Sequence, residues 1–422
     1  MLIDFTVKNY RSFRDVQLLS LYADSKPRHH SGNISYDNDL GILRTCAIYG
    51  ANASGKTNVI KAFEALKGIV VNSGDLKDGD RIGYYEPYML SADTANAPCH
   101  FEVEFYVEQQ RYRYQISFDS AQITYEKLDF YPASRAANLF TRDSATDWKA
   151  VKFGEHYRGG KRQIAFFANN AYLSRAGNSP DAPEVIRKVY NYFRQQTEAV
   201  TTEQNIRVVG WEDEPTYAAI VNTFLQRADF GIDKFEIEER NMESLGLPSD
   251  MPYEIKHKIR QDFSKTEVFF HRSDSGDLVK FNKDQESRGT RRLFKILPFF
   301  LTVLEQGMTL FFDELESSFH PHMAELIVKI FNDPLINKKG AQLIFTTHDL
   351  TLMAPDKMRK DQIYLVQKNA RGSELDSLES FDTSLKDSSP FAKWYNEGRL
   401  GGIPKINYRD ISDAIKAGIL NA

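Results

Sequence analysis

A glycine-bounded loop, "GANASGKT" at residues 50–57, is the stretch of this sequence best suited to chemistry. It fits the pattern G-x-x-x-x-G-K-[ST], in which glycines let backbone N–H groups turn inward around a phosphate group. An apolar stretch precedes the loop and a helical pattern follows it, so the positive end of a helix would face the same anion. A simple glycine turn between a strand and a helix is the alternative. The context favours a nucleotide triphosphate site.

Within this loop we expect Lys56 to reach the β- and γ-phosphate oxygens of ATP and Thr57 to bind Mg²⁺. Backbone and side-chain groups of the whole loop would surround the nucleotide, because the chain must wrap closely around the phosphates. The residues concerned are Gly50, Ala51, Asn52, Ala53, Ser54, Gly55, Lys56, Thr57 and Asn58.

Two acidic residues, Asp313 and Glu314, end another apolar stretch, "MTLFFDE". A buried parallel strand delivers the residues that follow it to the carboxyl edge of its sheet. Asp313 is there a candidate for holding Mg²⁺, directly or through water, and Glu314 for deprotonating the attacking water. A strand that ends in solvated acids is the alternative, and the presence of the phosphate loop argues against it.

His348 follows a third apolar stretch, in "AQLIFTTHDL". A histidine at the same sheet edge can hydrogen-bond a γ-phosphate and respond to its presence. A lone histidine is more often a surface residue, but its place after a third strand favours the phosphate role.

Small residues open a long amphipathic helix in "ESRGTRRLFKIL". Ser287 and Gly289 are suited to a second anion-binding nest at the helix N-terminus. Thr290 is the candidate N-cap of the same helix. Both interpretations can hold together.

The elements that must position these residues follow from hydrophobic periodicity. Short alternating runs from about 83 to 130 predict an antiparallel meander, and residues 183–230 have helical spacing. Strands and helices alternate after residue 266, which predicts an α/β fold. The stretch 233–265 is charged and loses periodicity, so it is a candidate linker or mobile arm.

We therefore expect three segments, in which the two ends of the chain form halves of one nucleotide-binding lobe. Residues 1–180 would carry the phosphate loop and an antiparallel sheet, and 181–265 an inserted, mainly helical lobe or arm. Residues 266–422 would carry the helix that begins near Ser287, the acidic strand and the histidine.

Composition limits the setting in which such a protein works. The 422 residues are 41% hydrophobic and 27% charged, as in an ordinary globular protein. A net charge of -4 argues against a broad surface that neutralises nucleic acid. Two cysteines, Cys46 and Cys99, favour a reducing compartment. Charged residues interrupt both the N-terminus and the longest apolar stretch, so we expect a cytoplasmic protein without a membrane partner.

The ordered set of motifs resembles the ABC-type ATPases of the RecF, SMC and OLD group, and most closely the RloA-like AAA ATPases of bacterial restriction and phage-defence loci. The resemblance runs over nearly the whole chain. It rests on "FTVKNYRSFRD", "IYGANASGKTNVIKA", "ITYEKL", "AYLSRAG", "ADFGI", "ESRGTRRLFKIL", "LFFDELESSFHP", "IFTTHD", "RKDQIYLVQKN", "GSELDSLESF" and "GRLGGIP". It implies an ABC-type P-loop head with a mixed central sheet, an antiparallel β subdomain and the inserted lobe. The insert lacks long heptad runs, which favours a compact RecF-like plan over a rod-bearing one.

The resemblance also implies roles across a dimer. Ser287 and Gly289 would contact the γ-phosphate bound by the loop of a second copy, so that two ATP molecules lie between two protomers. Asp313 would support the metal, Glu314 would be the catalytic base and His348 the switch histidine. His320 would be a dimer-face residue, and the glutamine that senses Mg²⁺ is placed only tentatively by sequence, at Gln115 or Gln122.

The function that we expect is an ATPase that senses a trigger and regulates a separate, nuclease-like effector in phage defence, as a homodimer or a higher homo-oligomer. No nuclease site is evident in this chain, because little sequence follows His348 and "DSGD" at 274–277 predicts a β-turn. One alternative is an ATP-dependent scaffold with very slow turnover. Another is a RecF-like repair ATPase that binds DNA through the basic loop "YRGGKRQ", while a phage protein is a further partner to consider.

Overall fold

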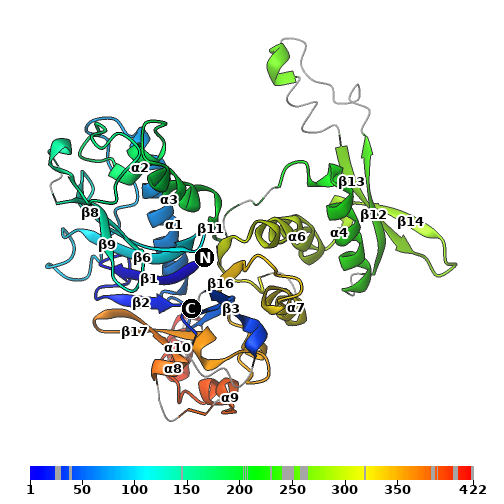
Figure 1. Ribbon diagram of the computed structural model, residues 1–422. Coiled ribbons are helices and arrows are strands. Elements are labelled where there is room, and N and C mark those ends of the chain that lie inside the picture. The colour runs from blue at the N-terminus through cyan, green and yellow to red at the C-terminus, as the bar shows by residue number, and fades with distance from the viewer. Residues whose placement is uncertain are drawn as a thin grey trace. The chain divides into compact units, whose positions relative to one another are not determined.

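The computed structural model describes the chain from Met1 to Ile419 apart from short stretches (Figure 1). These stretches are residues 24–29, 38–39, 144–145, 203, 205, 207, 229–230, 240–250, 257–264, 318–319, 382–384, 387 and 403–406. The chain forms two units. Unit 1 comprises Met1–Thr202, Gln306–Leu315 and Ile327–Ala422, and unit 2 comprises Glu203–Glu305 and Glu316–Leu326.

The strands and helices alternate along the chain. Up to residue 200 they are β1 (Leu2–Lys8), β2 (Gln17–Ser20), β3 (Ile34–Asp37), β4 (Leu40–Leu43), β5 (Thr45–Tyr49), α1 (Lys56–Asn72), β6 (Cys99–Val107), β7 (Gln110–Phe118), β8 (Ile123–Tyr131), β9 (Ala137–Arg142), β10 (Lys152–Phe153), α2 (Tyr172–Gly177), α3 (Glu184–Gln195) and β11 (Thr197–Val200). The remainder are α4 (Pro215–Arg227), β12 (Ile232–Glu239), β13 (Lys265–Arg272), β14 (Leu278–Asn282), α6 (Arg288–Gln306), β15 (Thr309–Phe312), α7 (Pro321–Asn332), β16 (Gln342–Thr346), β17 (Ile363–Asn369), β18 (Gly372–Ser377), α8 (Leu378–Phe381), α9 (Phe391–Asn396) and α10 (Tyr408–Ile419).

A six-stranded sheet in unit 1 carries the ends of the motif strands, in the order β11-β15-β16-β5-β17-β18. The strands from β11 to β17 pair in parallel, whereas β17 and β18 pair antiparallel. Every residue of β5, β15 and β16 is buried, which is typical of parallel strands covered on both faces. The predicted α/β fold is confirmed, and the two ends of the chain share one sheet. Because the strands are parallel, their carboxyl ends lie at one edge.

A second sheet in unit 1 has seven strands in the order β10-β9-β8-β7-β6-β1-β2. The predicted meander is confirmed, because β6, β7 and β8 pair antiparallel in direct succession. Glu108 and Gln109 join β6 to β7 with φ values of 48° and 65°. Positive φ at both central residues gives the type I′ turn, whose twist matches that of the paired strands.

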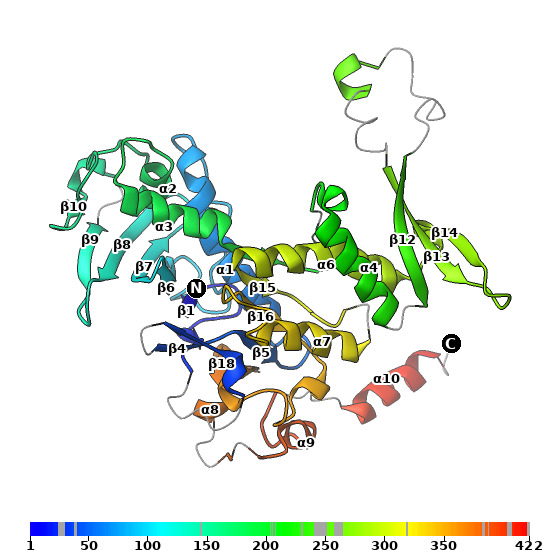
Figure 2. The ribbon, with the colours of Figure 1, turned by 45° about the vertical axis from the view of Figure 1, so that its right-hand side comes forward.

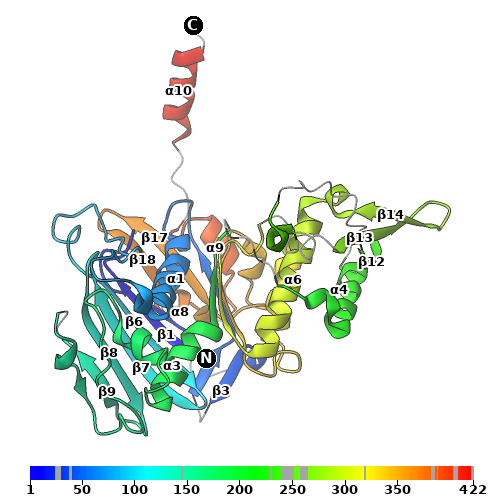
Figure 3. The same ribbon diagram turned by 90° about the horizontal axis from the view of Figure 1, so that it is seen from above.

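Helix α1 contacts both sheets through aromatic side chains (Figure 3). The ring of Phe63 stacks on Phe311 of β15 with centroids 4.0 Å apart. The same ring meets Phe5 of β1 edge-on at 5.4 Å. Aromatic pairs in these geometries add to the energy of area burial. The helix that follows the phosphate loop is thereby fixed against strands of both sheets.

Unit 2 combines helices with a sheet, where the sequence predicted mainly helices. Strands β12, β13 and β14 pair as an antiparallel meander beside α4 and α6 (Figure 2). Its apolar core consists of Trp211, Val221, Leu225, Ile232, Phe235, Phe269, Phe294 and Leu297. The predicted turn at 274–277 is present, since the N–H of Ser273 donates to the carbonyl of Asp277 at 2.8 Å.

Part of the predicted linker at 233–265 is therefore a strand, β12. Its sequence "IDKFEIEE" alternates apolar and charged residues, and the charges hide a period of two that only one covered face requires. Residues 240–250 and 257–264 of that stretch lie outside the described residues.

The boundaries of the units differ from the predicted segments. Helix α3 belongs to unit 1, because its Phe193 packs edge-on against Phe105 of β6 at 5.2 Å. Helix α6 and strand β14 belong to unit 2 rather than to the C-terminal half of the nucleotide-binding lobe. Within the described part of the chain, no helix combines the length and apolarity that crossing a membrane requires.

A buried ionic network fixes the start of α2. Glu126 of β8 accepts hydrogen bonds from the N–H groups of Tyr172 and Leu173 at 2.6 and 2.8 Å, two donors that the first turn of a helix leaves free. Nη1 of Arg142 lies 3.8 Å from Oε2 of Glu126, and both side chains are at most 1% exposed. Burial raises the pKa of Glu126, and the charge of Arg142 opposes that shift.

Replacing Glu126 with Ala leaves Arg142 as a buried charge without its carboxylate. We expect Glu126→Ala to lower the free energy of unfolding of unit 1 by about 3–5 kcal/mol, measured by denaturant unfolding with circular dichroism. Glu184→Ala is the control, since it removes an exposed carboxylate that pairs with Lys188 and should leave the midpoint unchanged. Equal midpoints for the two variants would contradict the structural role of Glu126.

Candidate functional site

The phosphate loop leaves β5 at Gly50 and enters α1 at Lys56. A Cβ atom on Gly50 would lie 2.4 Å from the carbonyl oxygen of Val366 in β17. Gly55 has a φ of 115°, and a Cβ there would lie 2.6 Å from the hydroxyl oxygens of Ser12 and Ser373. Both glycines of the motif are therefore required by close backbone packing as well as by the curvature of the loop.

The polar groups inside the loop suit a phosphate ligand. The backbone of Ala53 is left-handed, with a φ of 61°, and such residues help to turn successive N–H groups toward one anion. Nζ of Lys56 donates to the carbonyl oxygens of Gly50 and Ala51 at 2.9 and 3.1 Å. Oγ of Ser54 is buried without a hydrogen-bond partner among the residues that the structure describes. A buried hydroxyl in that state is costly, and a phosphate oxygen would satisfy it.

Asp313 is 2% exposed and receives two hydroxyl groups. Oγ1 of Thr57 donates to Asp313, at 3.2 Å from Oδ1 and 3.1 Å from Oδ2. Oγ1 of Thr346 donates to Oδ1 at 2.6 Å. Since β16 lies between β15 and β5, its last residue stands between the acidic strand end and the loop. The structure thus brings together Thr57 and Asp313, the two residues predicted to bind Mg²⁺.

These two residues fit a magnesium ion by their chemistry. A carboxylate and a hydroxyl supply hard oxygen ligands, and Mg²⁺ in nucleotide sites uses one or two carboxylates together with phosphate oxygens and water. In the described stretches of the chain, no group of three or more His, Cys, Asp or Glu residues is placed to hold a metal ion. Thr57 and Asp313 would therefore share the ion with the nucleotide.

Glu314 is half-buried and has a φ of 50°. This left-handed conformation is unfavourable for a residue with a Cβ atom. Two successive N–H groups are tied to β16 at this point, because that of Glu314 donates to Oγ1 of Thr346 at 2.7 Å. That of Leu315 donates to the carbonyl oxygen of Thr346 at 3.1 Å. The turn after β15 is thus held by a single residue of the neighbouring strand.

The exposed residue His348 lies two residues beyond β16. The main chain on both sides of it is tied to β5, because the N–H of Thr347 donates to the carbonyl of Ile48 at 3.1 Å. The hydroxyl of Tyr49 also donates to the carbonyl of Asp349 at 3.1 Å. The segment that carries His348 is therefore fixed to the strand that leads into the phosphate loop.

Ser287 and Gly289 lie at the N-terminus of α6 in unit 2. Ser287 is exposed, and its Oγ accepts a hydrogen bond from the N–H of Thr290 at 3.1 Å. Ser287 is therefore the N-cap, and the expectation that Thr290 caps this helix is corrected: Thr290 is the third helical residue, where its N–H needs an acceptor. His320, predicted to lie on a dimer face, is exposed.

Three polar residues that sequence inspection left without a role surround the loop. Oγ of Ser12 accepts from Nδ2 of Asn58 at 2.7 Å, and Nη1 of Arg11 donates to Oδ1 of Asn58 at 3.2 Å. Oγ of Ser373 donates to the carbonyl of Ser54 at 2.5 Å. Asn58 therefore braces the loop against the segment after β1. The signal in the sequence was the polar pair Arg11-Ser12 directly after a buried strand.

The structure places both candidate glutamines in the antiparallel sheet. Nε2 of Gln115 donates to Glu102 of β6, and Nε2 of Gln122 donates to Asp119 in the turn between β7 and β8. The strand beside β15 is β11, which has only four residues and falls in a stretch predicted as helical. The first glutamine after the carboxyl end of β11 is Gln204.

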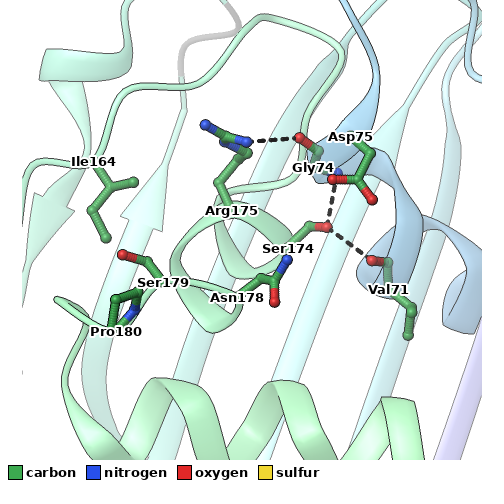
Figure 4. A pocket seen from close by; sticks show the side chains of 9 residues that line it. All are labelled: Val71, Gly74, Asp75, Ile164, Ser174, Arg175, Asn178, Ser179 and Pro180. Atoms are coloured by element: carbon green, nitrogen blue, oxygen red, sulfur yellow. Dashed lines mark hydrogen bonds between the residues drawn. The ribbon is translucent and has the colours of Figure 1, made fainter.

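A cavity of about 230 Å³ lies near the other end of α1 (Figure 4). Arg175 and Ser174 line it, and both hydrogen-bond the backbone of Gly74, at 3.0 and 2.8 Å. The 17 residues of α1 span roughly 25 Å, so this cavity is remote from the phosphate loop. None of the predicted site residues lines it.

Comparisons with known proteins agree with this geometry. Residues 46–354 match the family described as "AAA domain, putative AbiEii toxin, Type IV TA system". No curated protein matches the sequence. Among solved structures, the SMC head domain from Thermotoga maritima is similar at 14% identity and a TM-score of 0.38, over 89% of this chain and 98% of that chain. The family match runs from the strand before the phosphate loop to beyond His348, and the chain therefore belongs to this AAA domain family, a family of ATPases.

Proposed function

We propose that the chain hydrolyses ATP at the sheet edge where the phosphate loop meets Asp313 and Glu314. The observation that carries the proposal is the contact of Thr57 with Asp313, which joins two motifs 256 residues apart in the sequence. When bound by these two residues, Mg²⁺ supplies charge neutralisation at the β- and γ-phosphates. Lys56 binds the same oxygens and Glu314 takes the proton of the attacking water. His348 hydrogen-bonds the γ-phosphate.

The second part of the proposal is that ATP closes a homodimer. The exposed Ser287 and Gly289 lie at the start of α6, and a helix N-terminus favours an anion. Bound to the γ-phosphate of the opposite copy, they would complete two composite sites. Binding of ATP would close the dimer and hydrolysis would reopen it, so that the nucleotide state becomes a conformational signal.

The third part is that this signal regulates a separate effector in defence against phage. The description of the matched family names a toxin of a toxin–antitoxin system, which supports a role of this kind. An ATP-dependent change in the activity of a protein encoded beside this one is the observation that this part requires. A neighbour whose activity is the same with wild type and with a variant locked in the closed state would contradict it.

DNA binding is the alternative, and it rests on one loop. Arg158, Lys161 and Arg162 are exposed there, as a phosphate-binding loop requires. The aromatic residues beside them offer less than the sequence suggested, because Tyr157 and Phe166 are buried in the core of unit 1.

The catalytic assignment predicts two different defects in the same pocket. Lys56→Ala should weaken ATP binding at least about tenfold, since the β- and γ-phosphates lose a charged partner. Glu314→Gln should bind ATP normally but lower kcat about 100-fold or more, since no general base remains. Fluorescent-nucleotide binding and phosphate release measure the two effects.

Glu184→Gln is the matched control for this pair, because Glu184 is an exposed carboxylate on α3, and it should behave as wild type. Glu314→Gln turning over at the wild-type rate would show that another group is the base. A wild-type protein that binds ATP without measurable turnover would favour the scaffold alternative.

The composite site predicts that Ser287 acts on the opposite copy. Ser287→Arg should stop hydrolysis while sparing ATP binding, and Ser287→Asp should do the same, because its carboxylate repels the γ-phosphate. Aspartate is as good an N-cap as serine, so loss in that variant does not come from fraying of α6. Ser275→Arg, in the exposed turn between β13 and β14, is the control that should retain activity.

Mixing two inactive variants tests the arrangement directly. A dimer of Ser287→Asp with Lys56→Ala has one site in which the loop and the partner's Ser287 are both intact. Activity should therefore return on mixing, detected by phosphate release across a range of mixing ratios. Mixtures that remain inactive would show that Ser287 serves the loop of its own copy.

For the DNA alternative, replacing Arg158, Lys161 and Arg162 together by Ala should abolish DNA retention if this loop binds phosphates. The affinity of the wild type should then fall steeply with salt. Gel-shift titration at two salt concentrations gives both results. Wild-type protein with no affinity for DNA at low salt would remove this alternative.

A further inference from the structure

We propose that Thr346 is a positioning residue for hydrolysis, whose hydroxyl fixes the backbone that carries Glu314 and links it to the phosphate loop. This inference rests on the proposed ATPase function. Thr346 ends β16 and is fully buried. It was predicted as part of the buried strand, without a role of its own.

The protons at Thr346 have one arrangement. Carboxylate oxygens of Asp313 only accept, so the single hydroxyl proton of Thr346 points to Oδ1 at 2.6 Å. The N–H of Glu314 only donates, so a lone pair of the same oxygen must receive it at 2.7 Å. The hydroxyl is therefore a fixed relay between the Asp313 carboxylate and the Glu314 backbone.

The conformation of Glu314 explains why such a relay is needed. A φ of 50° is costly for glutamate, and backbone strain of this kind persists only where the surroundings hold it. Thr346 holds it through its hydroxyl and its carbonyl oxygen, which accept the N–H groups of Glu314 and Leu315. Without the hydroxyl, the Glu314 N–H is unsatisfied and the backbone can relax, which moves the carboxylate away from its working position.

The same relay reaches the phosphate loop. Thr57, the second residue of α1, donates to the Asp313 carboxylate that Thr346 also contacts. A continuous path therefore runs from Thr57 through Asp313 and Thr346 to the Glu314 N–H. When nucleotide and metal draw the Thr57 hydroxyl away from Asp313, Thr346 remains the donor that keeps Asp313 in place. The geometry thus couples occupation of the loop to the position of the base.

The neighbouring threonine shows that the effect belongs to one position. Oγ1 of Thr347 accepts from the N–H of Asp349 at 2.9 Å and so stabilises the turn that carries His348. The two adjacent threonines thus hold two different functional turns, the first at Glu314 and the second at His348.

Three variants of the full-length protein test the proposal with MgATP as the substrate. Thr346→Val keeps the shape and removes the hydroxyl, and we expect kcat to fall about 10- to 100-fold, with KM and nucleotide affinity within about twofold of wild type. Thr346→Ser should restore kcat to within about threefold, because the hydroxyl returns. Glu314→Gln combined with Thr346→Val should be no slower than Glu314→Gln alone, because the two residues act as one unit.

Thr309→Val is the matched control. Thr309 is a buried threonine at the opposite end of β15, and its hydroxyl donates to Oε1 of Gln342 at 2.9 Å. Losing that bond should lower stability while leaving kcat unchanged. A Thr346→Val enzyme with wild-type kcat would overturn the proposal. So would a Thr346→Ser enzyme as slow as the valine variant, since packing rather than the hydroxyl would then matter.

Hydrogen exchange separates this inference from the proposed function. The amide of Glu314 should exchange at least about tenfold faster in Thr346→Val than in Thr309→Val, because it has lost its acceptor. Equal exchange in the two variants would overturn the inference even if the protein is an ATPase. Faster exchange in a wild-type background without hydrolysis that depends on Lys56 would instead contradict the proposed function and leave Thr346 a purely structural residue.

Discussion

The buried carboxylate of Asp313 is the constraint on which the rest of the structure depends. A charge removed from water must be met by donors or by a cation, and Asp313 obtains them from both sides of β16. Thr57 reaches it from the phosphate loop and Thr346 from the strand in between. This requires β15, β16 and β5 to lie side by side in parallel and to end at one edge. The strand order is therefore the condition under which the site can exist.

The phosphate loop meets a second constraint, which is close packing against its own sheet. Gly50 allows the loop to pass the carbonyl of Val366, and Gly55 allows it to pass the hydroxyls of Ser12 and Ser373. Helix α1 is then held by Phe63, which contacts strands of both sheets. The loop is preorganised before any ligand binds, so little conformational entropy remains to be lost on binding.

The sequence was sufficient for features set by local pattern, namely the phosphate loop, the acids after β15 and the parallel strands. It was insufficient where partners are distant along the chain. Ser373 meets Ser54 across 319 residues, and no local pattern announces that contact. Thr346 looked like one more residue of an apolar strand, because its role depends on the register of β15 against β16. The cap of α6 was assigned to Thr290 rather than Ser287, since either residue fits an N-terminal pattern until the helix start is known.

The connections between the two units give the site a covalent route to the rest of the chain. Unit 2 begins at Glu203, directly after β11, and its first segment ends at Glu305, just before β15. Its second segment begins at Glu316, two residues after Glu314. Strands β11 and β15 are neighbours in the parallel sheet, so these connections meet unit 1 on adjacent strands. A change at Asp313 and Glu314 thus has only a few peptide bonds to cross before it reaches unit 2. A pocket that alternates between a bound and a hydrolysed nucleotide needs such a short path, because each added flexible bond would absorb part of the displacement.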